Sequence, residues 1–318
     1  MDGEAGNTML NTLVTLITGS ALVLAIPDED YEAPVSEAVS AIQQREGGLT
    51  GEQLVAELAP LYRSGDASAG ELLGELYYFG LNSIQRDPAK ACAIFEQIAP
   101  LRPDAAHNLA TCYFTGDGGE QDYGRARQWY VHAAEGGWVM ARCAYGNMLV
   151  RGEGGPVDPE PGLALCLSGA EAGHRDAQTD YGIYLLTGRG IERDPVKARQ
   201  WLERAAAQDQ ANATFLLGQI HEKGDGVPLD RAEAIEYFAR AHALGRPDAA
   251  MAAGRAYLFR GYKKEGEDVF VSAALLEKAD EWFAIAERSD PEAAQRDQAR
   301  ELRDAIAVLL REAAGNDE

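Results

Sequence analysis

The chain has 318 residues, 46% of them apolar, which is typical of a folded globular protein with a large buried core. It carries 51 acidic and 29 basic residues, so its net charge is −22. An acidic surface repels phosphate backbones, so general nucleic-acid binding is not expected, and partners with basic patches are favoured.

The first feature in chain order is an apolar segment, 1–30, whose stretch 9–27 is uncharged. Its length fits the core of a signal peptide cleaved after Ala25, although Asp2 and Glu4 stand where such a peptide normally has basic residues. Two interpretations stay open. An export signal would make the protein periplasmic or secreted, whereas an amphipathic helix packed on the following structure would leave it cytoplasmic. No later stretch is apolar and long enough to span a membrane.

Residues 31–68 contain two helical patterns, PVSEAVSAIQQ and GEQLVAELAPLYRSGD. The second resembles half of the unit that repeats further along the chain. We expect this region to form an N-terminal helical cap.

A 36-residue period dominates the middle of the chain. Stepping by 36 from Gly74 meets a small residue every time, namely Gly74, Ala110, Gly146, Gly182, Gly218 and Gly254. A large apolar residue often precedes this column, and a second glycine follows it by six residues in five of the six units. Such self-similarity indicates stacked structural repeats.

Each column has a physical reason. The phrase Leu-Gly-x-x-Tyr puts two large side chains on one helix face, and the glycine between them lets a second helix approach. The later glycine closes the helix in a left-handed conformation. An Asp column then predicts N-caps of the second helix, and an aromatic pair fills the space between units. The Asp column is Asp87, Asp122, Asp158, Asp194 and Asp230.

These columns resemble the SEL-one-like repeat family, which is related to tetratricopeptide repeats. The phrases LLGELYYFG and YGIYLLTGRGIERDPVKARQWLERAAAQ carry the likeness, which covers residues 69–286. The resemblance implies an all-α fold, a right-handed α/α superhelical solenoid of about six helix-turn-helix repeats with helical caps. It also implies an adaptor role for a protein that is expected to be monomeric.

Two units depart from the pattern. The third has Pro161-Gly162 where Lys-Ala is expected, so its second helix should start late or bend. The sixth has nine extra residues near Gly261–Val269, which are expected to form a surface loop or part of a binding site. No sustained strand pattern appears. Residues 288–318 read as a C-terminal capping helix, with self-association through it as an alternative. The predicted divisions are therefore 1–30, 31–68, 69–287 and 288–318.

The four cysteines, Cys92, Cys112, Cys143 and Cys166, form no CxxC pair, so a zinc site of the usual spacing is absent. Small apolar fillers on packed helices are expected. Two disulfides are the alternative if the protein is exported.

Candidate chemistry is sparse. The recurring GxG segments follow helices and lack the Lys-Ser/Thr of a phosphate loop, so they are interpreted as caps. His221 occupies the Tyr column and is expected in the core. No catalytic, cofactor-binding or metal-binding residues are predicted, and no enzyme activity is expected. No cofactor is expected.

The candidate binding site is the concave face, which relatives use as a peptide groove. Aromatic anchors with amide and guanidinium groups suit an extended peptide. Carrying the family's groove columns over gives Tyr78, Phe79, His107, Phe114, Asn147, Arg151, Thr179, Ile183, Phe215 and Gln219. The alternative is that these side chains pack inside the molecule.

The predicted function is a protein-protein interaction scaffold that binds a protein or peptide on its concave face, and the bacterial cell envelope is the location that the resemblance suggests. The alternative is a hydrolase or small-ligand-binding protein that uses the same groove, because β-lactam hydrolysis has been linked to some cysteine-rich relatives.

Overall fold

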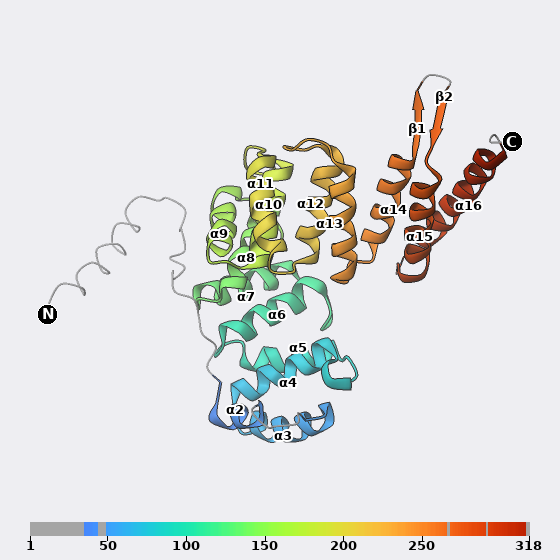
Figure 1. The fold of residues 1–318 in the computed structure, drawn as a ribbon. Helices are drawn as coiled ribbons and strands as arrows, with labels where there is room; N and C mark the ends of the chain where they lie inside the picture. The colour runs from blue at the N-terminus through green and yellow to red at the C-terminus, as the bar shows by residue number, and fades with distance from the viewer. Residues whose placement is uncertain (1–34, 44–48, 266–267, 291, 316–318) are drawn as a thin grey trace. The chain divides into compact units, whose positions relative to one another are not determined.

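The computed structural model describes residues 35–43, 49–265, 268–290 and 292–315. The chain divides into two compact units, Met1–Gly162 (unit 1) and Leu163–Glu318 (unit 2). In each unit, consecutive helices pack against one another as hairpins, so the predicted all-α solenoid is confirmed (Figure 1). The apolar segment 1–30 lies outside the described residues.

Unit 1 is built from consecutive helices that each pack on the next. A core formed by the first of them includes Leu58, Leu73 and Ile94. The helices are α2 (Glu37–Gln43), α3 (Gly51–Arg63), α4 (Ala67–Phe79), α5 (Pro88–Ile98), α6 (Pro103–Thr115), α7 (Tyr123–Glu135) and α8 (Val139–Arg151), with a 3-10 turn, η1 (Leu81–Ser83), after α4. Helix α9 (Pro159–Glu171) runs across the boundary between the units.

Unit 2 continues the hairpins and ends in a longer helix. Ala299 and Ile306 of this last helix are buried in one core cluster with Leu276 and Phe283, so the helix packs on the final hairpin. Its helices are α10 (Arg175–Thr187), α11 (Pro195–Ala206), α12 (Ala211–Lys223), α13 (Arg231–Ala243), α14 (Asp248–Gly261), α15 (Ala273–Ser289) and α16 (Ala293–Gly315).

The residues predicted to cap the ends of individual helices do so. The five glycines that follow α4, α6, α8, α10 and α12 have φ between 69° and 78°, the left-handed region that closes a helix. Side-chain oxygens of four residues in the Asp column accept hydrogen bonds from backbone N–H groups in the following first turn. These N-caps are Asp87, Asp122, Asp194 and Asp230.

The small-residue column lets the two helices of a hairpin approach each other closely. A Cβ added to Gly74 would lie 2.4 Å from the Phe95 ring, and one added to Gly218 would lie 2.5 Å from the Phe238 ring. Gly254 meets Phe283 in the same way, at 2.6 Å. The close approach of the second helix is as the repeat pattern predicts. The aromatic ring, however, occupies the volume that the missing side chain leaves inside its own hairpin, whereas the pattern analysis placed it between units.

The expected late start of the second helix in the third unit is wrong. Helix α9 begins at Pro159, directly after Asp158, in register with the other second helices. Pro161 is tolerated because it lies in the first turn, where backbone N–H groups have no partner within the helix. Gly162 replaces the usual alanine where the Gly146 carbonyl comes close, only 2.6 Å from an added Cβ.

The extra residues of the sixth unit form a β-hairpin rather than an irregular loop. Strands β1 (Tyr262–Glu265) and β2 (Asp268–Val271) pair antiparallel, with Tyr262 opposite Val271 (Figure 1). Four-residue strands are too short to give a recognisable alternation in the sequence, which is why the pattern analysis missed them. Among the described residues, no helix combines the length and apolar character needed to cross a membrane.

Candidate partner-binding surface

The first helices of successive repeats lie side by side in unit 1. Asn108 of α6 donates a hydrogen bond to Oε1 of Glu71 in α4, with an N–O distance of 2.6 Å. Glu71, Glu75 and Tyr78 share a helix face because they are four and three residues apart. We call the surface formed by Glu71, Glu75, Tyr78 and Phe79 of α4 and by His107, Asn108, Thr111 and Phe114 of α6 the unit-1 face.

Two carboxyl groups of this face are removed from water. Glu71 is only 8% exposed, and burial, followed by repulsion from Asp104 and Glu75, raises its pKa to about 8. Burial, followed by repulsion from Asp104, also raises the pKa of the half-buried Glu75. Such shifts mean that the ionised form of each group is poorly stabilised where it lies.

The positive charge near these groups is already engaged. Arg102 donates two hydrogen bonds to Asp104, from Nε at 3.1 Å and from Nη2 at 2.5 Å. Both residues are buried. This fork-shaped pairing offsets the charge of Asp104 only in part, because Asp104 still repels both glutamates. Among the described residues, neither Glu71 nor Glu75 forms an ion pair.

Aromatic side chains adjoin the acidic pair. The Tyr78 hydroxyl donates to Asp117 Oδ2 at 2.8 Å, and the Phe79 ring packs edge-on against Tyr78 with 5.0 Å between centroids. Phe79 is nevertheless 61% exposed. On α6, the His107 ring lies 5.3 Å from the Tyr130 ring and the Phe114 ring 5.3 Å from the Tyr123 ring. Four predicted groove residues therefore lie on the unit-1 face.

Asn147 and Arg151, predicted for the same groove, both lie on α8. Asn147 is half-buried and makes a polar contact. Arg151 is exposed, and its Nη1 lies 3.9 Å from Glu153 Oε1. An exposed ion pair of this length contributes little to stability, so the guanidinium is available to another carboxylate.

In unit 2, two predicted groove residues belong to the packing instead. Thr179 is 2% exposed, and its hydroxyl donates to the Arg175 carbonyl. Phe215 is 9% exposed, packs against Phe238 and lies 4.2 Å beneath the Arg246 guanidinium. The assignment of these two residues to a binding surface is therefore wrong. Ile183 and Gln219 are only half-buried.

Glu71, Glu75 and Asn108 were missed by sequence reasoning although a signal existed. The positions three before and one after the small-residue column supplied His107, Asn147, Thr179, Ile183, Phe215 and Gln219 as candidates. The same two columns in the first unit hold Glu71 and Glu75. Applying these two columns to the first unit as well would have identified Glu71 and Glu75 as candidates.

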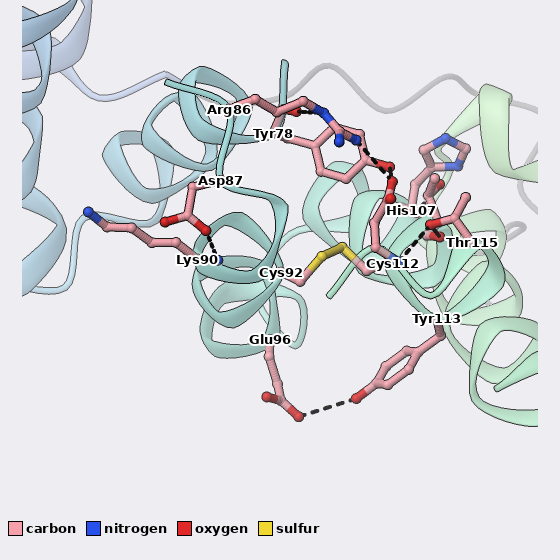
Figure 2. The surroundings of a disulfide bond; sticks show 12 residues. Tyr78, Arg86, Asp87, Lys90, Cys92, Glu96, His107, Cys112, Tyr113 and Thr115 are labelled. Carbon is pink, nitrogen blue, oxygen red and sulfur yellow. Dashed lines mark hydrogen bonds and ion pairs between the residues drawn. A yellow bond between two sulfur atoms is a disulfide. The ribbon is translucent and has the colours of Figure 1, made fainter. Parts of the chain in front are cut away.

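The cysteines are bridged, so their assignment as apolar fillers is wrong. Cys92 of α5 and Cys112 of α6 form a disulfide with a Cα–Cα distance of 6.0 Å (Figure 2). Cys143 and Cys166 are also disulfide-bonded, and no described cysteine is free. Sequence spacing does not reveal this pairing, because helix packing decides which thiols meet.

The loop after α6 lies directly on the bridge. A Cβ added to Gly118 would come within 2.5 Å of Cys92 Cβ and 2.7 Å of its Sγ. A cavity of about 600 Å³ adjoins this point, and its lining includes Glu96, Tyr113 and Arg125. The Tyr113 hydroxyl donates to Glu96 at 3.3 Å (Figure 2).

His221 is in the core, as predicted. It is 7% exposed, stacks on Tyr237 with 5.4 Å between ring centroids, and has Nδ1 3.2 Å from Glu233 Oε2. Within the described ranges, no group of three or more histidine, cysteine, aspartate or glutamate side chains is arranged to hold a metal ion.

Comparison with known proteins identifies the repeat. A family model described as Sel1 repeat matches residues 70–99, 103–138, 139–174, 175–210 and 211–245, which together make up more than half of the chain. The sixth predicted unit lies beyond these matches, although α14 and α15 pack as a hairpin. No curated protein matches the chain in sequence.

Solved structures share the fold. A Sel1 repeat protein from Oxalobacter formigenes is 23% identical with a TM-score of 0.63, and the alignment covers 81% of this chain and 100% of that one. A protective antigen of uropathogenic Escherichia coli with an SLR fold is 25% identical with a TM-score of 0.56. That alignment covers 78% of this chain but only 50% of the antigen.

Proposed function

The chain belongs to the Sel1 repeat family, whose repeats mediate protein interactions, and from this premise we propose that it is a scaffold that binds a segment of a partner protein on the unit-1 face. Phe79 carries the proposal. A large apolar side chain that is 61% exposed, beside a half-buried tyrosine and a polar rim, is typical of a contact residue at a protein interface.

The test is a crosslinking and capture experiment on the native full-length protein. We expect wild type to capture a defined partner and Phe79→Asp to weaken that complex by at least about tenfold, because a charge replaces the apolar anchor. Leu101→Asp is the matched control, since Leu101 is 70% exposed but lies in the turn between α5 and α6. Equal loss in both variants, or no loss in Phe79→Asp, would contradict the proposal.

We also propose that the protein acts in the bacterial cell envelope. The oxidised state of Cys92 and Cys112 supports this location, because disulfides persist in oxidising compartments and are rare in the cytosol. N-terminal sequencing with thiol labelling of the native protein tests it. A chain that starts near Ile26 with unreactive thiols is expected, whereas a retained Met1 with four reactive thiols would refute the location.

The hydrolase alternative has no observation in its favour and stays a prediction. A panel of generic ester and β-lactam substrates, assayed with the full chain, tests it directly. The scaffold proposal expects no turnover above background.

A further inference from the structure

The carboxyl pair on α4 differs from every other repeat. In the column of Glu71 the other units have His107, Cys143, Thr179, Phe215 and Met251, and in the column of Glu75 they have Thr111, Asn147, Ile183, Gln219 and Arg255. The stack therefore forms without an acid at either position. Two carboxyl groups on adjacent helical turns of one unit call for an explanation other than repeat packing.

One oxygen of this pair is left without a partner. Asn108 satisfies Glu71 Oε1, but Glu71 Oε2 is buried and has no hydrogen-bond partner in the part of the chain that the structure describes. Glu75 is four residues further along the helix, so it lies on the same helix face one turn away, and it is less deeply buried than Glu71. Once Glu71 ionises, this buried acceptor without a donor is costly unless a ligand supplies one.

In unit 2, the residue in the same repeat column as Glu71 is already in contact with a guanidinium group. Arg246 follows Phe215 by 31 residues and places its guanidinium over that ring, and Arg102 follows Glu71 by the same interval. Arg102 lowers the pKa of Glu71 but donates two hydrogen bonds to Asp104, and burial still dominates the pKa of Glu71. The charged groups that act on Glu71 are thus Glu75, Asp104 and Arg102, and they leave an excess of negative charge.

We propose that Glu71 and Glu75 form a receptor for a cationic side chain, an arginine or lysine of the partner segment, beside the apolar contact made by Phe79. This inference rests on the proposed function and names the chemistry of the partner. A guanidinium or ammonium group would donate to Glu71 Oε2 and to the Glu75 carboxylate, so that both acids ionise in the complex. The net charge of −22 attracts a basic segment to the protein from a distance.

The test uses N-acetyl-arginine amide as the probe and N-acetyl-citrulline amide as its uncharged isostere, titrated into the full-length protein with carbon-13 detection of glutamate carboxyl groups. Saturable binding of the arginine probe is expected, with a fall in the pKa of Glu71 from its value of about 8. At pH values below that pKa, the apparent affinity for the arginine probe should rise by up to about tenfold for each unit of increase in pH, because binding releases the Glu71 proton. The citrulline probe should not bind.

The variants Glu71→Gln and Glu75→Gln should each weaken arginine binding at least about tenfold. Gln keeps the oxygen that accepts from Asn108, so the fold is preserved, and unchanged circular-dichroism spectra check this. Glu135→Gln, an exposed acid on α7, is the matched control and should bind the probe like wild type. Equal binding of the two probes, an affinity independent of pH, or unchanged binding by both α4 variants would overturn the receptor.

The two proposals fail in different ways. If partner capture depends on Phe79 but not on Glu71 or Glu75, the cation receptor is overturned and the scaffold function stands. If arginine binds through both acids but Phe79→Asp captures the partner like wild type, the receptor stands and the proposed binding face does not.

Discussion

Glu71 is a carboxyl group whose ordinary pKa, near 4.5, is raised to about 8 by burial and then by the carboxylates of Asp104 and Glu75. The folded protein therefore holds a proton that the unfolded chain releases. This contribution to stability is fully present below pH 4.5 and is lost as the pH rises through 8. One side chain thus links the free energy of unfolding to pH over the neutral range.

Replacing this group removes that link. Between pH 5 and pH 8, the free energy of unfolding of wild type should fall relative to Glu71→Gln by on the order of 4 kcal/mol. Urea unfolding of both proteins at several pH values measures the difference. Parallel pH profiles for the two proteins would show that Glu71 does not titrate with a raised pKa in the native state.

Gly218 shows how a single missing Cβ supports a hairpin. Alanine in a helix interior is normally about 1 kcal/mol better than glycine. Here the added Cβ would lie 2.5 Å from the fully buried Phe238 ring. Overpacking costs about 1–3 kcal/mol, so we expect Gly218→Ala to destabilise the protein.

Thermal or urea unfolding of Gly218→Ala gives the sign directly. The same substitution in a Phe238→Leu background should cost less, because the smaller side chain yields to the new methyl group. A stabilising Gly218→Ala would mean that helix propensity outweighs the close approach.

At the scale of elements, the disulfide between α5 and α6 joins the second helix of one repeat to the first helix of the next. The bridged cysteines are 20 residues apart, a loop whose closure is worth about 3 kcal/mol in the unfolded chain. The Cys92→Ser/Cys112→Ser double variant should therefore unfold at lower urea concentration than oxidised wild type. An unchanged midpoint would show that helix packing alone holds this junction.

Elements also show which local signals tertiary contacts override. Helix α9 starts in register despite Pro161, because its first turn has no internal hydrogen bonds to lose. The β1–β2 hairpin forms although each strand has only four residues, because Tyr262 and Val271 at its base pack on the core that α14, α15 and α16 form. Both corrections concern segments whose conformation depends on what they contact.

At the scale of the whole molecule, five matched repeats and two compact units describe the chain. Each hairpin buries its apolar face mainly against its neighbours, so stability is a sum of local contributions. Residues that build the stack recur every 36 positions, whereas the residues at other positions can vary from one repeat to the next. The cluster of Glu71, Glu75 and Phe79 is such a departure, and the proposed function rests on it.

The sequence by itself determined the repeat, its caps and its glycine column. These features depend on contacts within one hairpin or between neighbours, and they recur often enough to be counted. Only the tertiary structure decided that Phe215 and Thr179 are buried, that Cys92 and Cys112 meet, and that Glu71 lies beside Asn108. Burial and pairing depend on how successive helices are rotated relative to each other, and the repeat pattern of the sequence does not determine that rotation.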